Sequence, residues 1–532
     1  MNIVDLNGWH TASAITYVDV NAAIAAGGQK PAGFTVAAPD NSASVTGTFG
    51  PWALTLGGAG PDIAMSIALT GGTVTGPFGA GGAQATLPLA ACVFPVMLLA
   101  TFVPHTATML NLRVNGTAPV TVGSYQGTPP TSSFLANAVL QELLQQWLTT
   151  NINLFNVVFA SVDLDAQYEN DGLSWLAPSY HGYAVSEPAS APSLENSVFA
   201  ILTLVDKAPA PTNLSYAVSP FAIPAGARAA FLIAGEKFLE HMMIAALPAM
   251  FQDLAPGSAM QHFAIDNAGT RIINTTDLRL QDVKLDNGNV VNPAVNTNNF
   301  TLQLDGTELV LSIMDMTFDM SAGIGIHLTY EGRSTLHYNK TNGILDLTVT
   351  TQTGSGSVEV SKGLQIAEYV LGAVAAASAL VSGLGGLVAK SASAAVDGSA
   401  AAISAAEQVG EDEEVAQAAT CSALGGMITR SPAEMSQLAA RSLAICRVGM
   451  IAGFVSGLMP SIVTIMKAVA EGKYQGLPKI TDLTSAAIGK TVIWPPVVGQ
   501  LVLDSAQLVG ALQFGLVTTP PPAPGAATGP GA

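Results

Sequence analysis

Three acidic side chains in the most strand-rich part of the sequence have a spacing that could support acid–base chemistry. Asp315 and Asp319 share one face of an expected strand, and Glu331 is nearby in the sequence. Paired carboxylates can accept and return a proton during a reaction. The same alternation is also typical of a strand face that water covers, and we favour that interpretation. If the protein is an enzyme, these are the carboxylates that the sequence singles out.

Familiar catalytic and metal-binding motifs are missing from the sequence. The chain has no G-x-S-x-G nucleophile elbow and no H-E-x-x-H zinc motif. IGKTV at 488–492 resembles the end of a phosphate-binding loop, but Thr484 stands where that loop requires its first glycine. Only His327 and His337 are near each other, and a hairpin could bring them together, but two ligands do not make a zinc site. We therefore expect no metal and no cofactor, and enzymatic activity is the less favoured function.

The charge balance of the chain limits its partners. Charged residues make up 11% of the 532 residues, and the formal net charge is −18. Binding to nucleic acid needs clusters of Lys and Arg against the phosphates, so we expect no nucleic-acid partner. The acidic balance also argues against simple electrostatic docking on anionic lipid.

The cysteines and the first residues bear on the compartment. Cys92, Cys421 and Cys446 are far apart, odd in number, and suggest no disulfide framework. The opening residues have neither the basic nor the apolar region of a secretory signal. We therefore expect a cytoplasmic protein in a reducing environment.

Strands are expected to dominate the elements that hold these residues. Short alternating runs cut by Gly and Pro predict paired strands at 44–58 and 62–76. Long strands with one apolar and one wet face are predicted over 301–350. The strand pattern returns after residue 499.

Helical spacing of apolar residues predicts helices over 8–26 and 132–152. It predicts a helix or a helix pair over 228–251, which Pro248 breaks or kinks. In the helix at 132–152 the predicted apolar stripe is formed by Phe134, Ala138, Leu143 or Leu144, and Trp147. A large sheet tends to curl, and such a helix can lie along its apolar concave face. The sequence therefore predicts an α+β fold of antiparallel sheets with a few long helices.

Methionines mark the best candidate for a binding surface. In the expected strand at 310–321, Met314, Met316, Phe318 and Met320 point the same way. Methionine is flexible and polarizable, so a surface rich in it adapts to varied apolar ligands. These side chains could line a tunnel opposite four residues of the expected helix, namely Phe231, Phe238, Met242 and Met243. An ordinary sheet–helix core explains each single residue at least as well.

An Ala-rich helical insertion is predicted over 364–475. It contains an uncharged run at 369–389, long enough to span a bilayer, and a second run at 448–466 that Pro460 interrupts. The two runs could form a membrane hairpin or pack face to face. We favour packing, because no cluster of Lys and Arg flanks them.

Several stretches resemble a known family, the clostridial 47-kDa toxin-cluster proteins and their OrfX relatives. They are NGWHTASAITYVDVNAAI, FGPWALTLGGAGPDIAMSIALTGGTV and ARAAFLIAGEKFLEHMMIAALPAMF, with DSAQLVGALQFG near the end. Together they are spread over most of the chain outside 364–475. None of them is a catalytic signature.

The family in turn resembles the TULIP superfamily of tubular lipid-binding proteins. That resemblance implies a strongly curved antiparallel sheet wrapped around a long helix, with an elongated apolar groove or tunnel for acyl chains. It implies binding of a lipid or other hydrophobic small molecule, in the setting of a toxin or secondary-metabolite cluster. This chain is poorer in Lys and Arg than the clostridial members, so the resemblance does not extend to recognition of anionic phospholipid.

Two other functions stay open at this point. The chain could be a structural or toxin-accessory protein that acts through protein or membrane contacts without an integral span. It could also be an enzyme that holds a hydrophobic substrate in the tunnel. For the organisation, we expect TULIP-like lobes at 1–210 and at 211–363 with 476–515, the helical insertion at 364–475, and a disordered tail at 516–532.

Overall fold

The structure is a computed structural model, and it describes residues 2–166, 171–255, 257–284, 290–321, 324–341, 344–360 and 490–518. The predicted helical insertion at 364–475, with both of its apolar runs, lies outside the described residues, and so do residues 519–532 of the predicted disordered tail. Residues 516–518, which that prediction also included, belong instead to a strand, and Leu516 is buried. Among the helices that are described, none has the length and apolar character needed to cross a bilayer.

The chain forms two compact units. The first comprises Met1–Lys237, Tyr338–Gly343 and Pro478–Ala532, and the second Phe238–His337 and Ile344–Leu477. The boundaries of these units differ from those of the predicted lobes at 1–210 and at 211–363 with 476–515. The two TULIP-like lobes remain a prediction.

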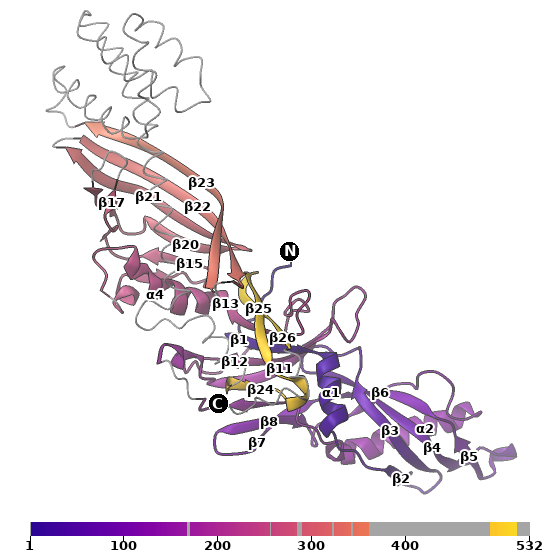
Figure 1. Cartoon of the computed structure of the whole chain (residues 1–532). Helices are drawn as coiled ribbons and strands as arrows, with labels where there is room; N and C mark the ends of the chain where they lie inside the picture. The colour runs from indigo at the N-terminus through magenta and orange to yellow at the C-terminus, as the bar shows by residue number, and fades with distance from the viewer. Residues whose placement is uncertain are drawn as a thin grey trace, which may run out of the picture. The chain divides into compact units, whose positions relative to one another are not determined.

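One part of the first unit is a curled sheet that packs against the helix α2 (Phe134–Asn151) (Figure 1). The strand order is β2-β3-β4-β6-β9, with β5 beside β4. The strands are β2 (Gly33–Ala37), β3 (Ser44–Leu54), β4 (Ile63–Gly76), β5 (Ala85–Leu89), β6 (Cys92–Leu98) and β9 (Thr121–Val122). Two register shifts between β3 and β4 mark irregularities of the kind that increase the local twist of a sheet. The strands predicted at 44–58 and 62–76 are thereby confirmed.

The predicted helix at 132–152 is confirmed, but its predicted stripe is partly wrong. The buried residues are Ala136, Asn137, Leu140, Leu143, Leu144 and Leu148. Phe134 and Ala138 are exposed, and Trp147 is half-buried. Phe134 and Ala138 lie on the side of the helix opposite to the buried Ala136 and Leu140, so the predicted stripe is displaced at the start of the helix.

A second sheet of the first unit contains the strand run β11-β12-β1-β13-β26-β25. Its strands are β11 (Tyr180–Ser186), β12 (Val198–Leu204), β1 (Thr11–Thr16), β13 (Ala229–Ala234), β26 (Ala511–Thr518) and β25 (Leu501–Leu508). A smaller sheet has the order β24-β10-β8-β7, formed by β24 (Val492–Ile493), β10 (Ala160–Asp163), β8 (Met109–Val114) and β7 (Ala100–Pro104). Short 3₁₀ segments are η1 (Ala80–Gly82), η2 (Ile152–Leu154), η3 (Asp171–Leu176) and η12 (Pro496–Val498).

Two predicted helices begin instead with a strand. The helix predicted over 8–26 is β1 followed by α1 (Tyr17–Gly27), and the one predicted over 228–251 begins as β13. β1 pairs with β12 on one side and with β13 on the other, so both strands are central and buried on both faces. Because a central strand has no polar face, its sequence cannot be told from a buried helix by periodicity.

The second unit is built on long antiparallel strands. Their order is β22-β21-β20-β15-β14, and β23 pairs with β22. The strands are β14 (Phe263–Ile265), β15 (Arg271–Asn274), β20 (Phe300–Asp305), β21 (Glu308–Ser321), β22 (Ile324–Asn339) and β23 (Ile344–Val360). Short pairs are formed by β16 (Leu278–Arg279) with β19 (Ala294–Val295), and by β17 (Val283–Lys284) with β18 (Val290–Val291). The strand region predicted at 301–350 is confirmed.

The helical segment after β13 is a chain of short turns rather than one helix. It consists of α3 (Gly235–Phe238), the π-helical η4 (Leu239–Met243), α4 (Ile244–Ala246) and η5 (Leu247–Ala249), and η6 (Ala259–Gln261) follows. Pro248 lies in η5, where an α-helix could not continue undisturbed.

The fold class is therefore confirmed in its main feature. All the strand pairings described are antiparallel, helices are few, and the sheets are curled. A tubular lipid-binding arrangement remains a prediction.

Candidate functional site

The helical segment of the second unit supplies a row of buried apolar side chains. Phe238, Leu239, Met242, Met243 and Ile244 are each at most 2% exposed. They recur at the spacing that places side chains on one face of a helix. Phe238, Met242 and Met243, three of the predicted tunnel residues, are therefore interior residues of this unit.

The strand that was expected to face them departs from simple alternation. In β21, Met316 is fully buried and Phe318 is half-buried, but Met314 is 57% exposed. The pairing with β22 shifts between Ile313 and Met316, so two residues oppose one at this point. Such a β-bulge reverses the facing of the residues before it. The prediction that Met314 shares a face with Met316 is wrong for this reason. Met320 belongs to β21, but its side chain is not among those described.

Phe231 lies in the first unit, on β13. It is buried opposite Phe514 of β26, and the two rings stack with centroids 6.2 Å apart. Of the eight predicted tunnel residues, the structure therefore places four, Phe238, Met242, Met243 and Met316, in the interior of the second unit.

Three phenylalanines in that interior were not predicted from the sequence. Phe251, Phe263 and Phe300 form a triangle with ring centroids 5.3 to 5.7 Å apart. All three are at most 4% exposed. They come from separate short segments, so no periodicity connects them, and only the fold reveals the cluster.

A buried asparagine fixes one member of this triangle. The side-chain amide of Asn274 donates to the carbonyls of Thr276 and Asn296, both at 2.8 Å, and its oxygen accepts from the backbone N–H of Phe300 at 2.9 Å. Asn274 is fully buried. Because its polar groups are satisfied, it can hold the start of β20 in place without a desolvation penalty.

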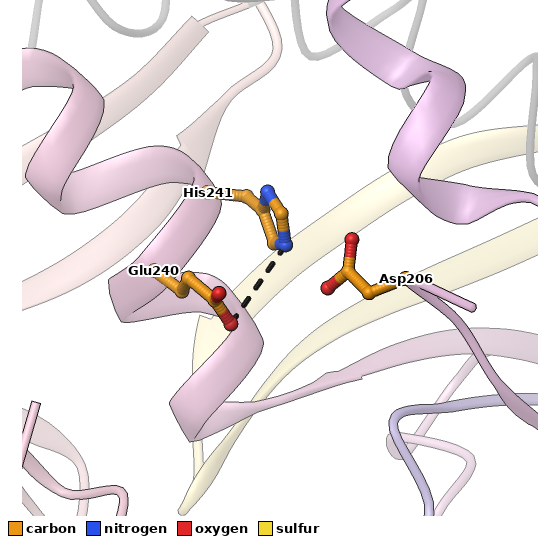
Figure 2. A group of neighbouring side chains, drawn as sticks. All are labelled: Asp206, Glu240 and His241. Atoms are coloured by element: carbon orange, nitrogen blue, oxygen red, sulfur yellow. Dashed lines mark ion pairs between the residues drawn. The ribbon is translucent and has the colours of Figure 1, made fainter. Parts of the chain in front are cut away.

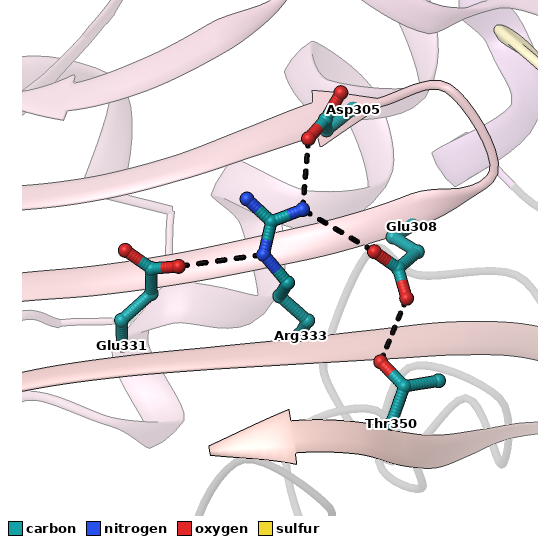
Figure 3. A network of polar contacts seen from close by, with 5 residues as sticks. All are labelled: Asp305, Glu308, Glu331, Arg333 and Thr350. Carbon is teal, nitrogen blue, oxygen red and sulfur yellow. Dashed lines mark hydrogen bonds and ion pairs between the residues drawn. The ribbon is translucent and has the colours of Figure 1, made fainter. Parts of the chain in front are cut away.

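A network around Arg333 ties four long strands together (Figure 3). The guanidinium donates to Asp305 at 2.9 Å, Glu308 at 3.3 Å and Glu331 at 3.4 Å, and Glu308 accepts from Thr350 of β23 at 2.7 Å. The hydrogen bonds to Asp305 and Glu308 raise the pKa of Arg333. Glu331 is thus part of a surface ion-pair network.

Asp315 has a partner of its own, His327. The Oδ1 of Asp315 lies 2.6 Å from the Nδ1 of His327 on β22, and both side chains reach the surface. Asp315 has φ +51°, which few residues other than glycine adopt readily. His337 lies ten residues further along the same strand. At about 3.3 Å a residue, the two histidines are about 33 Å apart. The expectation that a hairpin brings them together is wrong.

The strained backbone at Asp315 gives a prediction. Asp315→Val is expected to lower the free energy of unfolding by about 1–3 kcal/mol, because a β-branched residue is poorly tolerated at positive φ. Asp315→Gly also removes the pair with His327, but glycine adopts a positive φ without strain. This change is therefore expected to be neutral or slightly stabilising. Urea denaturation of both variants measures the difference, and equal effects would contradict it.

Other acid–base pairs lie near the helical segment (Figure 2). The Nε2 of His241 lies 3.8 Å from Oε2 of Glu240, both on the π-helical η4. Asp206 of the first unit, also drawn, pairs with the buried Lys237 of that unit at 3.0 Å. The expectation of no metal and no cofactor stays a prediction.

An ion pair between a buried carboxylate and a half-exposed arginine holds the start of α1 in the first unit. Asp19 accepts from the guanidinium of Arg228, and the hydroxyl of Thr16 donates to its Oδ2 at 3.1 Å. Burial raises the pKa of Asp19 above its usual value, and Arg228 and Thr16 offset part of that rise.

Comparison with known proteins decides the family. The OrfX-like family, described as "Protein OrfX2/OrfX3/P47", matches residues 6–410. The chain belongs to the OrfX-like family. Two curated OrfX3 proteins are similar in sequence. That of Clostridium botulinum is 30% identical over 126 residues, which is 24% of each chain. That of Paraclostridium bifermentans is 26% identical over 287 residues, 49% of this chain and 57% of the relative.

Solved structures of P47 share the fold. P47 from C. botulinum A2 superposes with a TM-score of 0.55 at 13% identity, covering 97% of this chain and 99% of P47. P47 from C. botulinum E1 gives 0.56 at 14% identity, covering 96% and 100%. The predicted resemblance to the clostridial 47-kDa proteins and their OrfX relatives is therefore confirmed.

Proposed function

We propose that this OrfX-like protein binds a lipid or another hydrophobic small molecule along the apolar interior of its second unit. The observation that carries the proposal is the composition of that interior. Phe238, Met242 and Met243 from the helical segment and Met316 from β21 are all buried. Methionine side chains rearrange at low cost, so a core rich in them can open around an acyl chain. A lipid-binding groove of the TULIP kind and a role in a toxin or secondary-metabolite cluster form part of this proposal.

A pair of methionines on one strand allows a matched test. Met316→Phe adds volume inside the second unit, whereas Met314→Phe adds it at the surface of the same strand. With cis-parinaric acid as a fluorescent probe, we expect saturable binding to the native protein. We expect binding to weaken by about tenfold or more in Met316→Phe, because overpacking removes space that the ligand needs. Met314→Phe should bind as the native protein does.

The same experiment can contradict the proposal. Urea unfolding of both variants establishes that the fold is retained. Native protein that binds no probe and carries no hydrophobic compound on organic extraction would overturn it. Equal probe binding by Met316→Phe and Met314→Phe would contradict the proposal that the ligand binds in the second unit.

A further inference from the structure

The first turn of α2 displays two large apolar side chains to solvent. Phe134 is 88% exposed and Leu135 is 52% exposed. The rest of the helix buries Leu140, Leu144 and Leu148 against the sheet, so the exposed pair does not belong to its core stripe. An exposed phenylalanine next to an exposed leucine is costly in water, and contiguous apolar surface of this kind marks an interaction site.

The turn is held rigidly, so its exposure is built into the fold. The hydroxyl of Ser133 caps the helix by accepting from the N–H of Ala136 at 3.3 Å. The backbone N–H and the hydroxyl of Thr131 both donate to Asn137 Oδ1, at 2.9 and 2.8 Å. The N–H of Ala90 donates to the carbonyl of Pro130 at 2.8 Å, which fixes this turn beside the link between β5 and β6.

Three smaller apolar residues are exposed in the segments that carry the pair. Ala138 lies one turn further along α2, and Pro129 and Ala90 lie at the hydrogen bond between Ala90 and Pro130. We call Phe134, Leu135, Ala138, Pro129 and Ala90 the Phe134 patch. Between Arg113 and Lys207 the sequence has no Lys or Arg, and the nearest acid along α2 is the exposed Glu142. The patch therefore offers no cation to an anionic partner.

The size of the patch favours a bilayer over a protein partner. A stable protein interface buries about 800 Å² on each partner. One aromatic side chain buries only about 150–250 Å². Two projecting side chains fall short of such an interface unless a shaped partner surrounds them. A fluid lipid interface needs no matching shape, and apolar side chains gain free energy there in proportion to the area they bury.

We propose that the Phe134 patch docks this protein on an electrically neutral phospholipid surface, with Phe134 and Leu135 inserted at the boundary between head groups and acyl chains. Neutral lipid is specified because the patch lacks cations and the whole chain carries a formal net charge of −18. The proposal does not rest on lipid binding inside the second unit, since the patch belongs to the first unit.

Vesicle flotation with the full chain tests the proposal. The native protein is expected to float with vesicles of palmitoyl-oleoyl-phosphatidylcholine. The double variant F134S/L135S is expected to partition at least about tenfold more weakly, because two side chains no longer bury apolar area. Leu154→Ser removes another exposed leucine, just after α2, and is expected to float as the native protein does.

Each further outcome decides for or against the proposal. Partitioning should change little between about 50 and about 500 mM salt, since no charge pairs are involved. Binding that requires phosphatidylserine, or that salt abolishes, would overturn the proposal. Flotation of F134S/L135S equal to that of the native protein would do the same. Absence of flotation, with a native oligomer that F134S/L135S dissociates on size exclusion, would identify the patch as a contact between copies instead.

Discussion

Phe300→Ala is expected to lower the free energy of unfolding by about 3–5 kcal/mol, because it removes a fully buried ring that two other rings contact. The backbone N–H of Phe300 still reaches the side chain of Asn274, so the loss reflects the cavity and not the hydrogen bond. The surrounding residues come from several short segments, which limits how far they can collapse into the space. Urea denaturation followed by fluorescence or circular dichroism measures the loss.

Met260→Ala provides the control for this prediction. Met260 lies in η6 of the same unit but is exposed, so its truncation is expected to change the free energy of unfolding by less than about 0.5 kcal/mol. A loss below about 1.5 kcal/mol for Phe300→Ala would mean that the phenylalanine triangle is not a tightly packed core. The proposed lipid-binding interior would then need to be located elsewhere in the unit.

Where one face of a strand meets water, the sequence predicted the strand well. In β4, Ile63, Met65, Ile67 and Leu69 alternate with smaller residues, and all four are buried. The same pattern succeeded for the long strands of the second unit. It failed for β1 and β13, because strands buried on both faces keep no alternation for a sequence analysis to find.

The predicted site was limited by local geometry that composition does not reveal. Met316 and Met242 are interior, as the pattern indicated, but the bulge at Asp315 turns Met314 outward. A single aspartate gives little warning of a positive φ in a sequence, although aspartate tolerates that backbone better than most residues other than glycine. The Phe134 patch shows the converse. Phe134 was predicted in the apolar stripe of its helix, but the structure exposes it on the side of α2 opposite to the buried residues.

Loss of the cation beside the buried Asp19 is the second large effect that we expect. Arg228→Met should lower the free energy of unfolding at neutral pH by about 2–4 kcal/mol. Removing one partner of a fully buried pair costs about 3–5 kcal/mol, because a charge remains without compensation. The side chain of Arg228 is 48% exposed, so water already screens part of the attraction and the expected loss is smaller.

The pH dependence of this loss gives it a specific signature. Burial already raises the folded-state pKa of Asp19 above its usual value, and removing Arg228 raises that pKa further. Consider pH values between the pKa of Asp19 in the unfolded chain and its higher pKa in the folded protein. In this window the folded protein binds more protons than the unfolded chain, so the free energy of unfolding decreases as pH rises. Arg228→Met should therefore be closest to the native protein in acid and fall behind it as pH rises toward neutral.

A double variant separates this electrostatic effect from lost packing. Asp19→Asn removes the buried charge, so D19N/R228M is expected to recover most of the stability lost by Arg228→Met at neutral pH and to lose the added pH dependence. The hydroxyl of Thr16 can still donate to the amide oxygen that replaces Oδ2 of Asp19. If the loss in Arg228→Met is the same at pH values on both sides of the window, and the double variant recovers nothing, the long stem of Arg228 stabilises α1 by apolar contact rather than by its charge.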